Sequence, residues 1–211
     1  MVRNLIQCLD LKSLRNPEVV ANLIRAFGIV QWGPPVFGDE EVFKNSHEDM
    51  AGIYQTPTQL APALVHLSKF KINSYLEIGV FQGGNFLFVS EYLRRFNPEI
   101  MCTAVDPTNF LNPEIQTIIE NEPFLNFISG TSYDLAGKEF DLVFIDGDHS
   151  TEWIEADFDN VGKYATNCVF HDIQETSCPD VITYWNKVKT SMSQEFLIHT
   201  SKSPLQGIGI L

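Results

Sequence analysis

The sequence predicts a doubly wound α/β domain, in which helices cover both faces of a mostly parallel sheet. Short apolar runs alternate with helical segments from residue 74 onward, and this alternation is typical of parallel strands joined by right-handed crossovers. The last two apolar runs differ, because a polar turn and no helix joins them. We therefore expect seven strands ending in a hairpin, a pattern unlike the six-stranded sheet of dinucleotide-binding domains.

The expected elements follow in chain order. Strands are predicted over 74–79, 101–106, 125–129, 141–146, 167–172, 195–200 and 206–211, and helices over 84–96, 113–121, 151–164 and 179–191. Residues 1–57 are expected to form a helical and loop extension, with a helix over 11–27 and a proline-rich loop over 32–43. Residues 58–211, beginning with a helix over 58–70, complete what we expect to be one structural domain.

The charge balance limits the partners. Twenty-seven acidic and 14 basic side chains give a net charge of −13, which repels a phosphate backbone and disfavours nucleic acid. A small neutral or cationic ligand, or a metal ion, suits the chain better. The four cysteines lie far apart without a C-x-x-C pair, so we predict core thiols and neither disulfides nor a zinc site. The absence of a signal-like or spanning apolar segment predicts a cytoplasmic protein without a membrane partner.

A glycine-rich turn follows the first predicted strand, from Glu77 to Asn85. Gly79 and Gly83 would let the backbone approach a ligand closely, because neither carries a Cβ atom. The spacing is G-x-x-x-G-G, and Glu77 at its entrance would repel a pyrophosphate but attract a sulfonium or ammonium. S-adenosylmethionine carries both cations, and Asp106 at the end of the next strand would meet its ribose. The alternative is that these acids are strand-end polar residues and the glycines serve only the turn.

Acids and histidines end two further strands. Asp146, Asp148 and His149 follow the strand over 141–146, and His171 and Asp172 close the strand over 167–172. We expect Asp146, His171 and Asp172 to converge as ligands of Mg²⁺ or Mn²⁺, and His149 to act as general base. The alternatives are strand-end caps for the two aspartates, a helix cap for His149 and a packed, hydrogen-bonded His171. Asp148 is expected to face solvent.

Three runs carry a resemblance to a known family: Glu-Ile-Gly-Val-Phe-Gln-Gly-Gly at 77–84, Ile-Asp-Gly-Asp-His-Ser at 145–150 and Phe-His-Asp-Ile at 170–173. Over about residues 52–211 the chain resembles class I S-adenosylmethionine-dependent methyltransferases, in particular the cephalosporin-hydroxylase-like group and the macrocin- and mycinamicin-type sugar O-methyltransferases. The resemblance implies a Rossmann-like sheet of order 3-2-1-4-5-7-6, with the last strand antiparallel, and S-adenosylmethionine as methyl donor.

The resemblance also implies residue roles. The segment 52–57 would form a lid over the cofactor, and 130–133 would lie against the adenine. In the metal-dependent sugar enzymes an acid after strand four and two acids after strand five bind Mg²⁺, and a histidine three residues after the first acid is the base. Asp146, His149 and Asp172 match these positions, whereas His171 stands where an acid is expected. The predicted cofactor residues are Gln55, Thr56, Glu77, Gly79, Gly83, Gly84, Asn85, Asp106, Pro107, Thr131, Ser132, Tyr133 and Asp146, and the predicted catalytic residues are His149 and Asp146.

The predicted activity is O-methyl transfer to a hydroxyl of a sugar, glycan or other small polyol. Two other classes stay open: a non-catalytic subunit that binds the cofactor, and a nicotinamide-dependent oxidoreductase, against which the glycine spacing and Glu77 argue. The aromatic residues Trp32, Phe37 and Phe43 lie in and around the proline-rich loop and would line either an acceptor pocket or a contact in a homo-oligomer.

Overall fold

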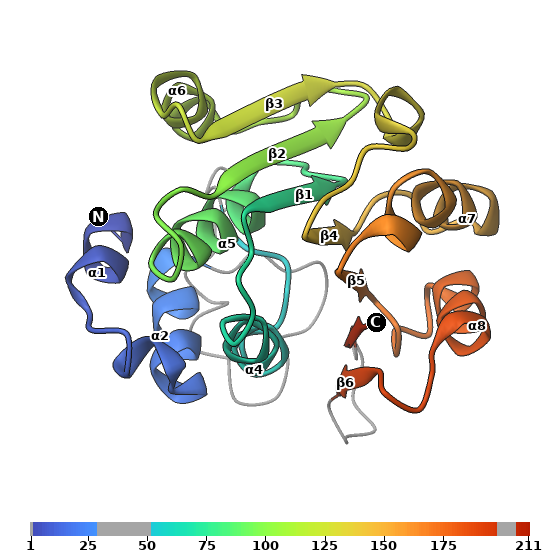
Figure 1. Cartoon of the computed structure of the whole chain (residues 1–211), viewed down its shortest axis with the longest axis horizontal. Helices are drawn as coiled ribbons and strands as arrows, with labels where there is room; N and C mark the ends of the chain where they lie inside the picture. Colours follow the sequence, from blue (N-terminus) through green and yellow to red (C-terminus); the bar gives the residue numbers. More distant parts are fainter. Residues whose placement is uncertain (1, 29–51, 198–205) are drawn as a thin grey trace.

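A computed structural model describes residues 2–28, 52–197 and 206–211. Its strands form a seven-stranded sheet of order β3-β2-β1-β4-β5-β7-β6 (Figure 1), in which β1 to β5 pair in parallel and β7 runs antiparallel to both β5 and β6. The expected fold, strand order and antiparallel last strand are confirmed. The strands are β1 (Ser74–Ile78), β2 (Met101–Asp106), β3 (Leu125–Ser129), β4 (Leu142–Ile145), β5 (Asn167–His171), β6 (Gln194–Phe196) and β7 (Ile208–Ile210).

The helices begin and end where local chemistry dictates. Pro17 opens α2, and the Asn16 side chain accepts a hydrogen bond from the Glu18 amide, so the helix predicted over 11–27 starts only there. A 3-10 turn, Ser13–Arg15, precedes it, and the helix predicted over 151–164 likewise divides at Val161 into α7 and a second 3-10 turn. The helices are α1 (Val2–Cys8), α2 (Pro17–Phe27), α4 (Pro57–Leu67), α5 (Gly84–Arg94), α6 (Pro113–Asn121), α7 (Thr151–Asn160) and α8 (Pro179–Val188).

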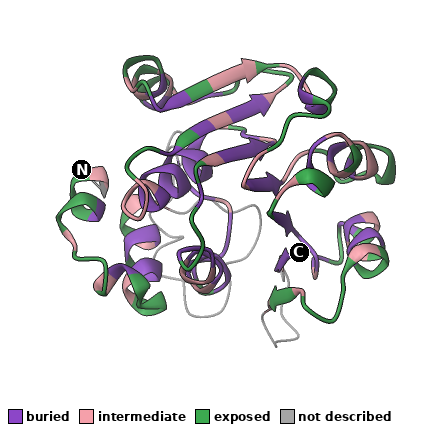
Figure 2. Cartoon of the chain, viewed as in Figure 1, coloured by how far each residue is buried: buried purple, intermediate pink, exposed green. Residues whose placement is uncertain are grey.

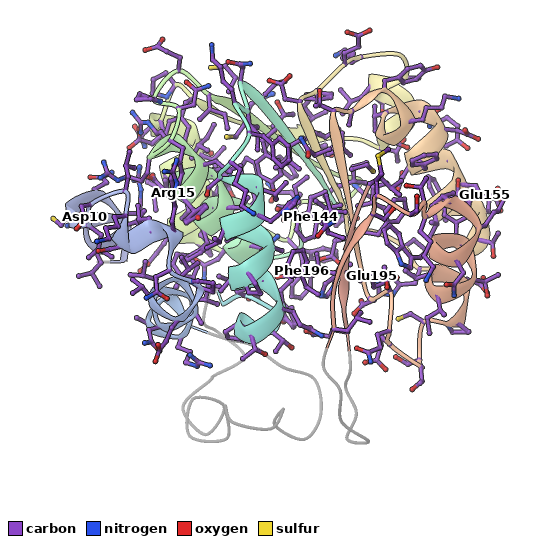
Figure 3. The ribbon with its side chains drawn as sticks, turned by 60° about the horizontal axis from the view of Figure 1, so that its bottom comes forward. Asp10, Arg15, Phe144, Glu155, Glu195 and Phe196 are labelled. Carbon is purple, nitrogen blue, oxygen red and sulfur yellow. The ribbon has the colours of Figure 1, made fainter. Side chains whose placement is uncertain are left out.

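Each face of the sheet carries its own hydrophobic core, because successive side chains of a strand point to opposite faces. Tyr75 and Phe144 pack on the face covered by α2, α4 and α5, whereas Leu76 and Val143 pack on the face covered by α7 and α8. Strands β1, β4 and β5 and the inner sides of these helices are largely buried, whereas the edge strands β3 and β6 are mostly not (Figure 2). Phe144 lies in the middle of the molecule (Figure 3). Residues of α2 such as Ile24 belong to the first core, so the N-terminal helices pack on the sheet domain.

The turn after β1 lies directly against the turn after β4. Gly79 has φ +80°, and a Cβ atom there would stand 2.3 Å from the Asp146 carbonyl oxygen and 2.4 Å from the Gly147 Cα. The Gly79 amide donates to the Val105 carbonyl, and the Asp146 amide donates to the Ile78 carbonyl. These contacts bring the carboxyl ends of β1, β2 and β4 together, which is where parallel sheets bind ligands.

Some sequence predictions fall outside the described residues. These are the loop over 32–43, with Trp32, Phe37 and Phe43, and the end of the strand predicted over 195–200. Among the residues that the structure describes, no helix combines the length and apolar character needed to cross a membrane.

Replacing Gly79 with alanine should unfold or strongly destabilise the protein, because the new methyl group overlaps the backbone after β4. We expect a loss of roughly 3 kcal/mol or more in the free energy of unfolding, measured by urea denaturation. Gly137→Ala is the matched control: Gly137 also has positive φ (+77°), but no atom lies within 4 Å of its Cβ position. It should cost about 1 kcal/mol. Equal losses in the two variants would contradict the packing argument.

Candidate active site

A pocket of about 1140 Å³ opens at the carboxyl ends of β1, β2, β4 and β5. Its described lining includes seven carboxylic acids and two histidines but neither lysine nor arginine. Burial in such surroundings favours a cationic or neutral ligand over an anionic one. The acids are Glu77, Asp106, Asp146, Asp148, Asp157, Asp172 and Glu175.

Most of the predicted site residues line this pocket. The predicted base His149 does so, as do the three predicted metal ligands Asp146, His171 and Asp172. The predicted cofactor residues in the lining are Gln55, Glu77, Gly79, Gly84, Asn85, Asp106, Pro107, Thr131, Ser132 and Asp146.

Three predicted cofactor residues lie outside the lining. Thr56 is buried and donates its amide and hydroxyl to the side-chain oxygen of Gln206. Gly83 packs against protein, since a Cβ there would stand within 2.8 Å of Leu111 and Ile115. Tyr133 is 58% exposed and packs edge-on against Trp153, which itself lines the pocket. Gly83 therefore serves packing between segments of the chain, whereas Gly79 both packs against the turn after β4 and lines the pocket. The sequence pattern does not distinguish these two roles.

Glu77 is buried at the floor of the pocket. It accepts hydrogen bonds from the Tyr75 hydroxyl and, at 3.0 Å, from the Asn85 amide. Burial raises the pKa of Glu77 to about 8, although both hydrogen bonds favour the charged form. The carboxyl group is therefore largely protonated at pH 7, and a sulfonium or ammonium beside it would favour the carboxylate.

Asp106 holds the glycine-rich turn. Its Oδ2 atom accepts hydrogen bonds from the amides of Val80 and Phe81, at 2.9 and 3.2 Å. These bonds stabilise Phe81 at φ 45°, a backbone conformation that is strained for an aromatic residue. The Phe81 ring, 40% exposed, packs against Tyr54 and Phe110 at centroid distances of 5.3 and 6.0 Å. This aromatic rim of the pocket was not predicted, because only backbone geometry brings the three rings together.

His171 joins the two aspartates at the carboxyl ends of β4 and β5. Its Nδ1 atom lies 2.8 Å from Asp146 Oδ1 and 3.2 Å from Asp172 Oδ2. Burial opposes protonation of the imidazole, but the negative charges of both carboxylates outweigh it and raise the pKa of His171 well above its ordinary value. The buried Nε2 atom has no hydrogen-bond partner among the described residues. Asp172 itself adopts φ 60°, which turns its side chain back toward His171.

His149 bridges Asp172 and a cysteine. Its Nε2 atom lies 3.3 Å from Asp172 Oδ2, and its Nδ1 atom lies 3.1 Å from Cys178 Sγ. Its side chain is 41% exposed. It does not cap the following helix, because the amides of Ser150 and Thr151 donate to Asp148 and Asp180. Asp148 is exposed, as expected.

The segment before α4 covers one side of the pocket. Gln55 is buried and donates to Asp146 Oδ2 at 2.5 Å. Gln206 donates to the Tyr54 carbonyl at 2.7 Å, in addition to its bonds with Thr56. Residues about 150 positions apart in the sequence thus form one wall, and no local pattern around Gln206 indicates this role.

The sheet order, with its antiparallel last strand, and the pocket at the strand ends define the class I methyltransferase fold. Residues 76–173 match the family model described as a methyltransferase domain. The chain therefore has the class I methyltransferase fold, and just under half of it matches the methyltransferase-domain model.

Solved structures share this fold. N-methyltransferase NodS from Bradyrhizobium japonicum in complex with S-adenosyl-L-homocysteine is 14% identical over 78% of this chain and 92% of its own, with a TM-score of 0.55. The S-adenosylhomocysteine-bound methyltransferase PaMTH1 of Podospora anserina is 12% identical over 79% and 82%, with a TM-score of 0.54. An O-methyltransferase from Bacillus cereus is 12% identical over 96% and 91%, with a TM-score of 0.51. The comparison with curated proteins gives no match.

Glu77 should make the free energy of unfolding fall as pH rises. Folding raises its pKa from 4.5 to about 8, so the folded state holds a proton that the unfolded state releases. Its stabilising contribution is complete below pH 4.5 and is lost by up to about 1.4 kcal/mol per pH unit as pH approaches 8. Urea denaturation at a series of pH values from about 5.5 to about 8 tests this, because the range lies between the two pKa values of Glu77. The free energy of unfolding should fall more steeply with pH for the wild type than for Glu77→Gln. Parallel pH profiles would contradict the assignment.

Proposed function

We propose that this chain binds S-adenosylmethionine in the pocket and transfers its methyl group to a hydroxyl oxygen of a sugar or another small polyol. The observation that carries the proposal is the acidic pocket at the strand ends of a methyltransferase domain, with no lysine or arginine in its described lining. That lining suits a sulfonium cofactor and a neutral acceptor. The solved relatives bound to S-adenosylhomocysteine support the same cofactor here.

The cofactor would lie along the strand ends. Glu77 and Asn85, at the floor of the pocket, would face the cationic methionine part. Asp106 keeps a lone pair of Oδ1 free for a ribose hydroxyl, because among the described residues Oδ1 accepts from one backbone amide, that of Thr108, whereas Oδ2 accepts from two. Thr131 and Ser132 would lie beside the adenine, and Trp153 lines that end of the pocket. A dinucleotide fits less well, since the described lining offers its pyrophosphate several carboxylic acids and neither lysine nor arginine.

His149 would act as general base. A neutral imidazole takes the proton of the acceptor hydroxyl while the oxygen attacks the methyl carbon, and the electron pair of the broken carbon–sulfur bond stays on the sulfur. Asp172, 3.3 Å from Nε2, would stabilise the imidazolium that forms. The partly exposed ring can approach an acceptor, and the fixed positions of donor and acceptor would supply much of the rate.

Asp146, His171 and Asp172 fit a divalent cation in the chemistry of their donors. One donor atom from each lies within 4.8 Å of the others, and the carboxylates supply two negative charges. In the structure the His171 imidazole satisfies both carboxylates, so a cation would take the place of its proton. A cation bound there would hold an acceptor hydroxyl and favour its deprotonated form. Gln55, which contacts Asp146, would orient that ligand.

S-adenosylhomocysteine should bind the purified chain with micromolar affinity in a calorimetric titration, and NAD should not. His149→Ala should keep this affinity, because the cofactor contacts lie elsewhere in the pocket. The same variant should lose about 10²- to 10⁴-fold in turnover once a panel of sugars and polyols has given an acceptor.

Failure of the folded chain to bind S-adenosylhomocysteine would sink the proposal. Full turnover by His149→Ala would leave the cofactor assignment standing but remove the base. If only acceptors of another class are methylated, and no sugar or polyol is, the proposed acceptor class would be wrong.

Methyl transfer should also stop in excess chelator and return when Mg²⁺ or Mn²⁺ is added, if the cation site operates. Asp146→Asn should not respond to the added cation, because it has lost one of the two charged ligands. Turnover that is undiminished by chelator would show that His171 and its two carboxylates work without a metal ion.

A further inference from the structure

We propose that His149, Asp172 and Cys178 form a binding site for a thiophilic divalent cation of the zinc class, at one end of the pocket. This inference goes beyond the proposed methyl transfer and rests only on the geometry of the three side chains. Each offers a different donor, and one donor atom from each lies within 4.8 Å of the others. The spacing of the cysteines does not indicate such a site, because the ligands come from three separate segments.

The distances are close to those that such an ion requires. Cys178 Sγ lies 3.1 Å from His149 Nδ1, and His149 Nε2 lies 3.3 Å from Asp172 Oδ2. Zinc bonds of about 2.0–2.3 Å in a tetrahedron place neighbouring donor atoms about 3.5 Å apart. The two contacts use different nitrogens of the ring, so the partly exposed side chain of His149 would rotate to direct one nitrogen at the ion. The donor atoms of the three residues already lie within 4.8 Å of one another. Three protein ligands would leave the fourth position to water or another ligand in the pocket.

The backbone holds Cys178 in this position. The Glu175 amide donates to the Asp172 carbonyl, and the Cys178 amide donates to the Glu175 carbonyl, so two successive turns lead from the end of β5 to Cys178. Glu175 further fixes the loop by accepting from Ser177 and Gln206. Cys178 then begins α8 as its N-cap residue. Hydrogen bonds along this loop therefore fix the backbone position of Cys178, and with it the position of the thiol.

Charge and ligand softness select the class of ion. A coordinated thiolate and the Asp172 carboxylate together balance a divalent charge, and the thiol proton leaves to solvent when the sulfur binds. Sulfur and imidazole ligands suit zinc-class ions and disfavour Mg²⁺, which prefers oxygen. The site thus differs from the one proposed at Asp146, His171 and Asp172, with which it shares only Asp172.

A cysteine beside a histidine and an aspartate also resembles the arrangement of a nucleophilic thiol. The carboxylate of Asp172 lies close to the sulfur, and its negative charge disfavours a free thiolate there. A bound cation would supply the positive charge that the thiolate lacks, which favours the ligand role over the nucleophile role. Because the ion would bind the His149 imidazole, which is assigned to proton transfer, zinc-class ions should inhibit methyl transfer.

Cobalt(II) is the probe that tests this site, because a cobalt–thiolate bond gives a charge-transfer absorption band in the near ultraviolet. The metal-free full chain is titrated with Co²⁺ in excess Mg²⁺ and followed by absorption spectroscopy. We expect the band in the wild type and in Cys8→Ser, whose exposed cysteine lies on α1, and no band in Cys178→Ser. His149→Ala should keep the fold, since its ring is partly exposed, and should weaken Co²⁺ binding about tenfold or more.

A band that survives in Cys178→Ser, or its absence from the wild type, would overturn the proposal. So would unchanged Co²⁺ affinity in His149→Ala. Circular dichroism of each variant shows whether it folds, and the His149→Ala result decides the matter if Cys178→Ser does not. Because the readout is metal binding, it can fail while S-adenosylhomocysteine still binds, which separates this inference from the proposed function.

Discussion

The carboxylates at the ends of β4 and β5 could not lie so close together without the imidazole of His171 between them. Asp146 and Asp172 are both mostly buried, and their mutual repulsion in a poorly solvated pocket would be large. His171 lies within hydrogen-bond distance of both, and the favourable charge interaction outweighs the burial that disfavours a protonated ring. The neighbouring contacts extend from this group, through Asp146 to Gln55 and through Asp172 to His149 and Cys178.

Much of the fold could be predicted because its signals are local. Parallel strands buried on both faces appear as short apolar runs, and Pro17, Pro113 and Pro179 mark the first turns of helices. The convergence of Asp146, His149, His171 and Asp172 followed from one topological fact, that all parallel strands end at the same edge of the sheet. Predicting that these residues share one site therefore required only the order of strands and helices along the chain.

The rest depended on contacts that no window of sequence contains. Gln206 forms part of the pocket wall only because β7 (Ile208–Ile210) pairs with β5 and so brings the segment before it to Thr56. Cys178 was predicted as a core thiol, and its contact with His149 depends on the turns of residues 172–178. Tyr133 and Gly83 lie within the predicted motifs, but the Tyr133 side chain is exposed and Gly83 packs against Leu111 and Ile115. Position in a motif fixes where the backbone passes and leaves the direction of each side chain open.

Phe81 shows how the mouth of the pocket can vary while the strands beneath it stay the same. Its backbone lies in a region that glycine occupies without strain, and the two amide bonds to Asp106 hold the turn whatever side chain residue 81 carries. Substitution by a smaller residue would remove ring surface from the mouth of the pocket, and substitution by glycine would also release backbone strain. A smaller residue at position 81 can thus widen the mouth of the pocket without destabilising the turn. Natural variation at residue 81 can therefore alter which molecules enter the pocket while the strand ends beneath it stay unchanged.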